Sequence, residues 1–258
     1  MMTSSSKENK KIKKPLKIIL VLFFWLAVWE AASLLVSDEL KIFLPSPFRV
    51  IEKWVATGFT YEYIKAALAT LLRIFVGFAA GIFTGFILGI LTSAFSVINL
   101  LLSPVLKCVR AVPVVSFIIL AFLFLKVDYL PIFISFLMVV PLIWQTVHDS
   151  AANPDRKLKE MCAVYGIKKT KAIFRVYLPQ ALPQIITACV NALGFAWKSG
   201  VAAEVICTPD VSLGHKIYSA KSELNFDEVY AVTLTVILLS LFIEFLLKFL
   251  FRKRTTND

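Results

Sequence analysis

Six apolar segments dominate the chain and restrict what it can fold into. A helix needs roughly 20 mainly apolar residues to cross the hydrocarbon core of a bilayer, which is about 30 Å thick at about 1.5 Å per residue. Segments that reach or approach this length occupy residues 16–36, 70–91, 113–125, 129–147, 185–207 and 229–250. We therefore predict an all-α, polytopic membrane protein with about six transmembrane helices.

The third segment has only 13 residues, too few to span a bilayer unless its helix begins earlier. The preceding residues 96–112 contain Pro104, Lys107 and Arg110. We expect this stretch to form an interfacial or broken helix that leads into the third span.

The composition agrees with a membrane protein. The 258 residues are 59% hydrophobic and 17% charged, and the mean hydropathy is +0.79, whereas about a quarter of the residues in a soluble domain are charged. Soluble enzyme folds are excluded on this ground. The net charge of +11 could indicate a nucleic-acid partner, so the positions of the lysines and arginines decide its meaning.

Lysine and arginine gather on one predicted side of the membrane, and cytoplasmic loops retain these residues preferentially. With six crossings and an internal N-terminus, the inner segments hold 19 of them, Lys107 and Arg110 included, against seven in the outer segments. This asymmetry predicts a cell-membrane protein with both termini in the cytoplasm, and it explains the net charge without nucleic acid. A secretory signal peptide is the alternative for the first 36 residues, but no small-residue cleavage site follows them, and Glu30 interrupts the apolar run.

The same reading divides the chain into three parts. Residues 1–15 form a basic cytoplasmic tail, residues 16–250 the transmembrane domain, and residues 251–258 a second cytoplasmic tail. Within the transmembrane domain, residues 148–184 form one large inner loop between the fourth and fifth spans.

Small residues recur at four-residue spacing in two of the spans. Glycine lowers helix propensity, so several glycines on one helix face indicate that another helix approaches very closely there. The second span carries Gly77, Gly81, Gly85 and Gly89, and the fifth carries Ala188, Ala192, Ala196 and Gly200. We predict tight helix packing at these positions, and the same faces could also slide or rock against their neighbours during a transport cycle.

Charged residues inside a span are costly, so each of them is a candidate functional residue. Lys198 lies in the fifth span, with Asn191 on roughly the same side, because an interval of seven residues superposes on a helix. Together with the neighbouring Trp197, these residues are candidates for lining an anion pathway. The alternative is that Lys198 pairs with an acidic residue on another helix.

The inner loop carries the most informative pattern. Asn153 and Pro154 suit a helix start, and Gly166 suits a helix end. Between them, Leu158, Met161, Cys162 and Tyr165 fall on one side and most of the charges elsewhere, which predicts a short amphipathic helix. From these residues alone, the helix could rest on the lipid surface or dock into a soluble partner.

The segment from Glu160 to Pro179 resembles the EAA loop of binding-protein-dependent ABC transporter permeases, E-A-A-x-x-x-G followed by nine residues and I-x-L-P. Glu160, Gly166, Leu178 and Pro179 are in register, and Val176 replaces the isoleucine. Met161 and Cys162 stand where the family has two alanines. Three further stretches, residues 70–78, 110–117 and 194–206, are similar to the nitrate, sulfonate and taurine branch, although L-F-L-K-V-D after the third span departs from it.

This resemblance implies a type I (MetI-like) permease architecture and a set of partners. Two permease copies, a homodimer, would form the pathway in the lipid bilayer, and an extracytoplasmic solute-binding protein would dock on the outer face. A dimer of cytoplasmic ABC ATPase subunits would grip the EAA helix and drive import of a small solute such as nitrate, a sulfonate or taurine. The ATPase-coupling residues would be Glu160, Met161, Cys162, Gly166, Leu178 and Pro179.

The chain itself is not expected to be an enzyme or to hold a cofactor. It has no G-x-x-x-x-G-K-[ST] phosphate loop, so the ATPase would be a separate chain. The four cysteines stand far apart and there are two histidines, which indicates no metal site. Two alternatives stay open: import of a neutral or aromatic vitamin precursor by the same architecture, and an ion-coupled secondary transporter.

Overall fold

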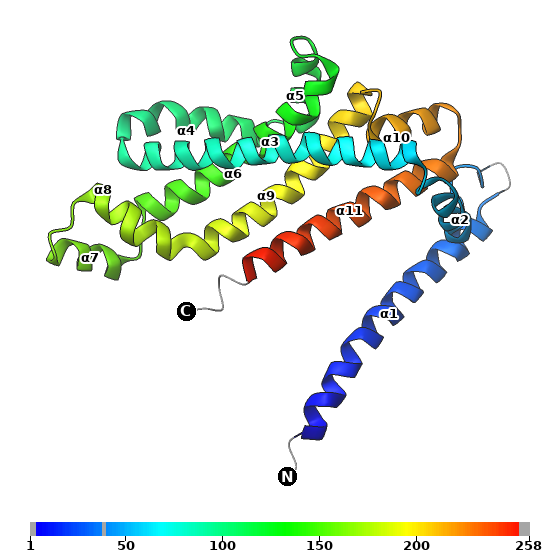
Figure 1. Ribbon diagram of the computed structural model, residues 1–258, viewed down its shortest axis with the longest axis horizontal. Helices are drawn as coiled ribbons and strands as arrows, with labels where there is room; N and C mark the ends of the chain where they lie inside the picture. Colours follow the sequence, from blue (N-terminus) through cyan, green and yellow to red (C-terminus); the bar gives the residue numbers. More distant parts are fainter. Residues whose placement is uncertain (1–3, 38–39, 253–258) are drawn as a thin grey trace.

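The structure, a computed structural model of one chain, describes residues 4–37 and 40–252, with the side chains of residues 17–249 apart from positions 18, 38, 39 and 169. Most of the predicted tail at residues 251–258, and the side chains of the basic tail at residues 1–15, lie outside the described part. The described chain is an elongated bundle of helices (Figure 1). Its two ends are called here the α7 end and the α10 end, after the short helices found there.

Four helical segments are long and apolar enough to cross a membrane. They are Tyr61–Ala94 (α3), Val127–Ala152 (η1, Val127–Tyr129, with α6, Leu130–Ala152), Thr170–Cys207 (the end of α8, Lys169–Ala172, with η2, Ile173–Tyr177, and α9, Leu178–Cys207) and Phe226–Phe249 (within α11, Phe226–Arg252). The all-α prediction is confirmed, and these helices contain the second, fourth, fifth and sixth predicted spans.

The other two predicted spans differ from regular transmembrane helices. The third is a bent pair, α4 (Ser96–Ala111) and α5 (Val114–Phe122), which meet at 102° and count as one broken span at most. The first lies in α1 (Ser4–Leu35), whose apolar part Ile19–Leu35 is shorter than the other spans. In Figure 1, α1 diverges from the bundle, and its apolar side chains are largely exposed in the single chain.

The closest helix contact joins α3 to α6 through the four glycines of α3. A β-carbon at Gly81 would lie 2.7 Å from Cβ of Val139, and one at Gly89 would lie 2.6 Å from Cβ of Val147. Added β-carbons at Gly77 and Gly85 would meet backbone carbonyl oxygens of α6. Each glycine therefore allows an approach that a side chain would prevent, and the predicted close packing of this face is directed at α6.

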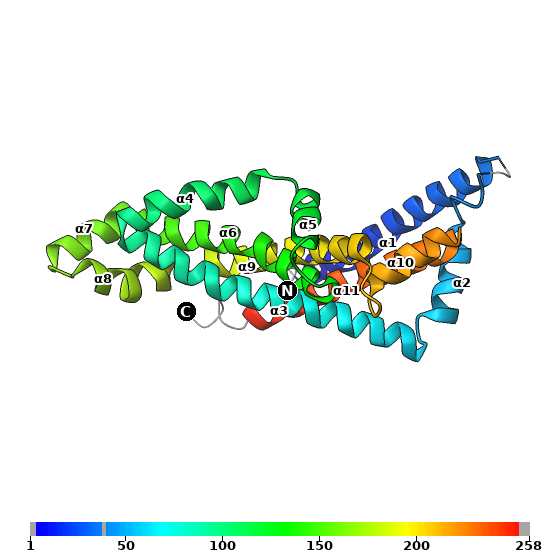
Figure 2. The same cartoon turned by 90° about the horizontal axis from the view of Figure 1, so that it is seen from above.

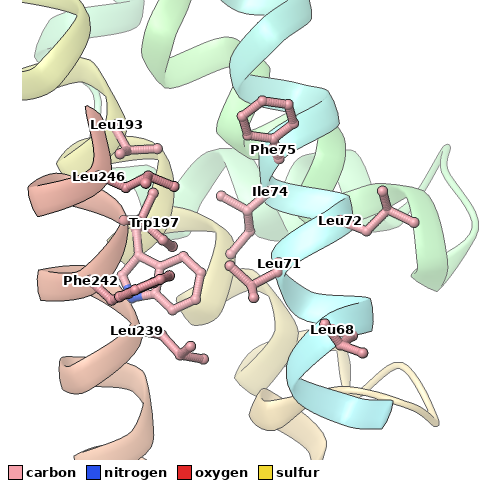
Figure 3. Close-up of a pocket in the computed structure, with 11 residues that line it drawn as sticks. Leu68, Leu71, Leu72, Ile74, Phe75, Leu193, Trp197, Leu239, Phe242 and Leu246 are labelled. Atoms are coloured by element: carbon pink, nitrogen blue, oxygen red, sulfur yellow. The ribbon is translucent and has the colours of Figure 1, made fainter. Parts of the chain in front are cut away.

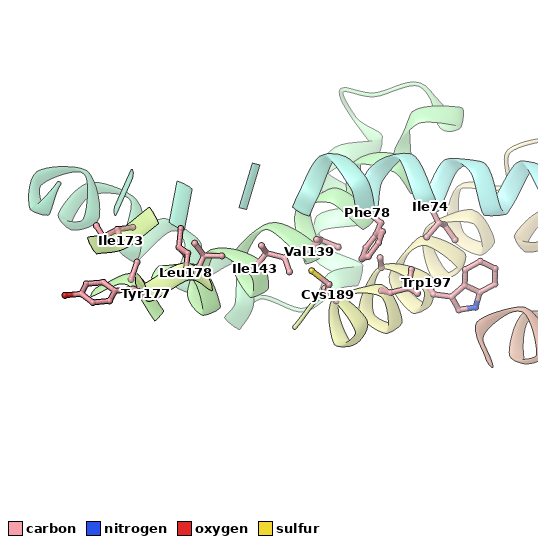
Figure 4. Close-up of a cluster of buried hydrophobic side chains, with 14 of the residues drawn as sticks. Ile74, Phe78, Val139, Ile143, Ile173, Tyr177, Leu178, Cys189 and Trp197 are labelled. Carbon is pink, nitrogen blue, oxygen red and sulfur yellow. The ribbon is translucent and has the colours of Figure 1, made fainter. Parts of the chain in front are cut away.

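The fifth predicted span, in α9, packs against both α6 and α3 and continues the core. Gly200 faces Ile74 and Ser135, and an added β-carbon would lie 2.6 Å from a side-chain atom of each. Ser135 also donates a hydrogen bond to the carbonyl oxygen of Ala196, at 3.1 Å. A continuous apolar cluster runs along α3, α6 and α9 as far as η2 (Figure 4).

The charge count assigned Lys107 and Arg110 to an inner segment, but the structure places both residues in α4, which packs within the bundle. This helix begins just after α3 and runs back beside it toward the α10 end (Figures 1 and 2). Leu106 belongs to one buried cluster with Val140 and Trp144 of α6, so α4 reaches the middle of α6. Lys107 and Arg110 therefore lie near the middle of the bundle along its long axis. The number of lysines and arginines assigned to the inner side falls from 19 to 17, against seven on the outer side. The expectation of a broken helix in this region is confirmed.

Short helices close the α10 end. The helix α2 (Pro47–Thr57) begins at Ser46, whose hydroxyl accepts the backbone N–H of Arg49 at 3.4 Å. Its Arg49 pairs with Asp227 of α11 at 3.0 Å, and Trp54 donates to the Thr235 hydroxyl at 2.8 Å. These contacts fasten α2 to the start of α11, beside α10 (Leu213–Ser222).

We predict that Gly81→Ala destabilises the protein. The new methyl group would force α3 and α6 apart, and overpacking of this kind costs about 1–3 kcal/mol. The control is Gly194→Ala in α9, where no atom lies within 4 Å of the added carbon and alanine favours the helix by about 1 kcal/mol. Thermal unfolding in detergent should show a lower midpoint for Gly81→Ala only. Equal midpoints for the two variants would contradict the α3–α6 contact.

Candidate functional site

The predicted amphipathic helix of the inner loop is α7 (Arg156–Val164). The prediction of its start was wrong by two residues. Asp155 is the N-cap, and its carboxylate accepts the backbone N–H of Lys157 at 2.8 Å. Asn153 instead ends α6, where its N–H bonds to the carbonyl oxygen of Asp149 at 2.9 Å. Aspartate and asparagine are both good caps, so the spacing alone could not separate them.

Gly166 ends α7, as the sequence predicts. Its φ is +61°, a left-handed conformation that costs other L-residues about 1–2 kcal/mol. The N–H of Gly166 bonds to the carbonyl oxygen of Ala163 at 3.1 Å, and the N–H of Ile167 to that of Cys162 at 2.9 Å. This pair of bonds is the Schellman motif of helix ends. The chain therefore turns sharply away from α7 at this position.

The side chains of α7 divide into buried and exposed groups. Cys162 is buried, and Leu158 packs on the same core. Met161 and Tyr165 are 39% and 77% exposed, although the sequence placed them on the apolar side, because the core reaches only the middle of the helix. Glu160 is exposed and forms a salt bridge of 2.8 Å with Arg156 one turn earlier. The free end of α7 thus presents apolar side chains that nothing in the described chain covers.

The chain leaves this loop through a π-helical turn, η2, before α9 begins. The N–H of Leu178 bonds to the carbonyl oxygen of Ile173, five residues earlier. Pro179 explains the wider turn, because its ring would clash with the carbonyl group of Arg175 in a regular α-helix. Leu178 is buried in the core and Pro179 is exposed. Turns of this type occur mostly as single insertions, often at functional sites.

The three candidate pathway residues do not lie together. Asn191 and Lys198 are exposed on one side of α9. Trp197 is buried, and its indole N–H donates to the carbonyl oxygen of Val236 in α11 at 3.1 Å. Trp197 instead lines an apolar pocket of about 420 Å³ between α3, α9 and α11 (Figure 3). The alternative of an acidic partner for Lys198 is not met by any residue that the structure describes.

A buried carboxylate organises the α10 end. Glu204 of α9 is fully buried and accepts a hydrogen bond from the Thr70 hydroxyl at 2.7 Å and one from the backbone N–H of Gly214 at 3.3 Å. Arg73 of α3 lies 3.6 Å from the other carboxylate oxygen. The Thr70 hydroxyl also accepts the backbone N–H of Leu213, at 3.0 Å. These residues join α3 and α9 to the N-terminus of α10, and they are called the Glu204 network below.

Arg73 extends the Glu204 network to the neighbouring loops. It donates to the carbonyl oxygen of Val211 at 2.7 Å and pairs with Asp128 of η1 at 2.8 Å. The sequence analysis missed the roles of Thr70 and Gly214. An added β-carbon at Gly214 would overlap the side chain of Glu204. The sequence indicated this network only by two polar residues within predicted spans, Thr70 and Glu204.

Comparison with known proteins identifies the family. Residues 77–256 match the family described as binding-protein-dependent transport system inner membrane component. The chain belongs to this family. It is thus a membrane permease component of an ABC importer, which decides against the ion-coupled secondary transporter.

Relatives match over most of their length. A probable ABC transporter permease of Brucella melitensis is 27% identical, covering 83% of this chain and 87% of the relative. The taurine transport system permease TauC of Escherichia coli is 26% identical, covering 88% and 84%. The nitrate import permease NrtB of Synechocystis is 26% identical, covering 94% and 89%. All three names describe membrane components of transport systems.

A solved structure confirms the architecture. The chain is similar to one chain of the MetNI methionine ABC transporter in an inward-facing conformation, with a TM-score of 0.66 and 17% sequence identity, covering 76% of this chain and 98% of that one. At this identity the likeness shows the fold alone, and it agrees with the expected MetI-like permease architecture.

We predict that Thr70→Val weakens the α10 end. The change keeps the shape of the side chain but removes the donor to Glu204 and the acceptor for Leu213, and buried groups left without partners cost about 1–3 kcal/mol each. The control is Thr187→Val in α9, an exposed threonine whose hydroxyl donates to the carbonyl oxygen of Pro183. Hydrogen exchange of the α10 amides in detergent should accelerate at least about tenfold in Thr70→Val. Unchanged exchange in that variant would mean that the Glu204 network does not hold α10.

Proposed function

We propose that this permease imports a small solute that carries an anionic group, such as nitrate, a sulfonate or taurine, and that α7 is the element through which an ATPase drives it. A homodimer of the chain would enclose the pathway in the cell membrane, with both termini in the cytoplasm. A solute-binding protein would deliver the anion at the α10 end. The single observation on which this rests is the free end of α7 in a chain of this family.

The geometry of α7 supports its role in coupling. Met161, Val164 and Tyr165 are exposed at its C-terminal turn, and a cluster of exposed apolar side chains suits a protein interface. Behind it, Cys162 and Leu158 hold the helix to the core that continues into α9. A push on α7 would therefore reach α9 directly. Glu160 and Arg156 would contact the ATPase from the polar side.

Two independent features support an anionic solute. Relatives that cover most of the chain are named for taurine, nitrate and bicarbonate transport. In addition, Lys198 is a cation in a span, and it has no acidic partner in the part of the chain that the structure describes. An unpaired cation facing a pathway would favour an anionic solute over a cation or a neutral vitamin precursor.

We predict that the double variant Met161→Asp, Tyr165→Asp separates the ATPase from the permease. Burial of side chains of this size contributes about 1.5–3 kcal/mol each, so the affinity should fall more than about tenfold. The readouts are the amount of ATPase that co-purifies with the tagged permease, and ATP-dependent uptake of labelled nitrate and taurine by proteoliposomes. Both should fall.

The matched control is Tyr218→Asp, an equally polar change at an exposed tyrosine of α10 at the other end of the bundle. It should retain the ATPase. Undiminished co-purification and uptake in the α7 double variant would overturn coupling through α7. If the unmodified complex assembles with its ATPase and binding protein but takes up neither nitrate, taurine nor bicarbonate, the choice of an anion is wrong while the coupling role stands.

A further inference from the structure

Two cations on α4 take part in none of the contacts described so far. Lys107 and Arg110 are exposed in the single chain, and neither forms an ion pair or hydrogen bond with any residue that the structure describes. By contrast, Arg49, Lys53 and Arg73 near the α10 end all pair with carboxylates. Charge pairing therefore does not explain the two cations of α4.

The position of these cations along the bundle axis is unusual. Leu106 shares a buried cluster with Val140 and Trp144, and Val140 lies close to the middle of α6. Lys107 is the next residue, and Arg110 lies about 4.5 Å further along the helix axis at about 1.5 Å per residue. Both side chains thus project from the middle of a bundle whose long helices span the membrane. Exposure to lipid at this depth is strongly unfavourable for a charge.

The backbone beside Arg110 points to water for a separate reason. Helix α4 ends at Ala111, and α5 leaves at 102° from Val114. Pro113 has no N–H, so the carbonyl oxygen of Val109 lacks its usual helical donor. Broken backbone at membrane depth is tolerated only where protein covers it or where it lines a water-filled cavity. The break lies two residues beyond Arg110.

Polar groups continue from these cations along one side of α4. At 100° per residue, Asn99, Ser103, Lys107 and Arg110 fall within an arc of about 80°. The side-chain oxygen of Asn99 is buried and has no hydrogen-bond partner among the described residues. Val105 and Val97, in contrast, lie on roughly the opposite side and are exposed apolar residues. Helix α4 is therefore amphipathic, with its polar side at membrane depth.

We propose that Lys107 and Arg110 form an anion-contact site on α4, in a water-filled pathway at the middle of the membrane. The ligand class is a small inorganic or sulfonate anion, held by two adjacent cations and by the polar side of α4. The site rests on the proposed import of an anion and adds residues to it that lie on a different helix from Lys198. Arg110 also lies in the last turn of α4, where the helix dipole favours a cation, so Lys107 is the more diagnostic residue.

The test measures the charge selectivity of a thiol placed at position 107. Cys108 is exposed and would react with the reagents, so it is replaced by serine. The other cysteines, Cys162, Cys189 and Cys207, are buried and are kept. Lys107→Cys is then introduced. The full permease–ATPase complex in proteoliposomes is treated with the anionic reagent sulfonatoethyl methanethiosulfonate or the cationic trimethylammonioethyl analogue. Each rate is divided by the rate for a free thiol in solution. We expect the anionic reagent to be favoured by about tenfold, because Arg110 attracts it and repels the other reagent.

Two further variants make the result specific. Adding Arg110→Gln to Lys107→Cys should bring the normalised ratio close to one. Val105→Cys, on the opposite side of the same helix at the same height, should react slowly with both reagents. Nitrate at millimolar concentration should slow the anionic reagent at position 107 and leave Val105→Cys unaffected.

The outcomes separate this site from the proposed function. An unreactive thiol at position 107, or a normalised ratio near one with Arg110 present, overturns the site even if the complex imports nitrate or taurine. A ratio near ten that falls with Arg110→Gln supports the site. If the ratio is high but the complex imports no anion, the site remains an anion-attracting surface, and the proposed anion import fails.

Discussion

The contact between α3 and α6 is the constraint on which the rest of the bundle depends. Lipid chains are as apolar as leucine, so helices in a membrane associate through close packing and hydrogen bonds more than through the hydrophobic effect. Four glycines of α3 remove the side chains that would keep α6 at a distance, and Val139 and Val147 fill the space. Because α6 also carries α4 and α9, the position of these two helices depends on how closely α3 approaches.

Helix α9 connects the two ends where partners would act. At the α7 end it follows the π-turn η2 and shares a core with α7. At the α10 end it holds Glu204, which is bonded to α3 and to the start of α10. A helix of 30 residues is stiff along its axis, so a displacement at one end is carried to the other. The π-turn η2, in which the N–H of Leu178 bonds to the carbonyl oxygen of Ile173, interrupts the regular α-helical hydrogen bonding along this path.

Sequence patterns predicted the features that depend on local chemistry. Gly166 is required by its left-handed φ, and the glycine spacing on α3 reflects one continuous face. The patterns were less reliable where tertiary contacts decide. Asp155 rather than Asn153 caps α7, and Trp197 turns toward α11 instead of sharing the exposed side of Lys198. Periodicity states which residues share a face of one helix, but it does not state which neighbouring helix that face meets.

The error in placing the two cations of α4 has a more specific cause. Hydropathy treats a segment with lysine, arginine and proline as too polar to enter a membrane, and the charge count then assigns its cations to a cytoplasmic loop. That inference assumes that every residue at membrane depth faces lipid or apolar protein. It fails where a protein keeps water inside the membrane, because a cation is then hydrated rather than buried. Removing a charge from water is costly, and this cost explains why cations usually stay in loops. For the same reason, unpaired Lys107 and Arg110, which lie level with Val140, indicate a hydrated path.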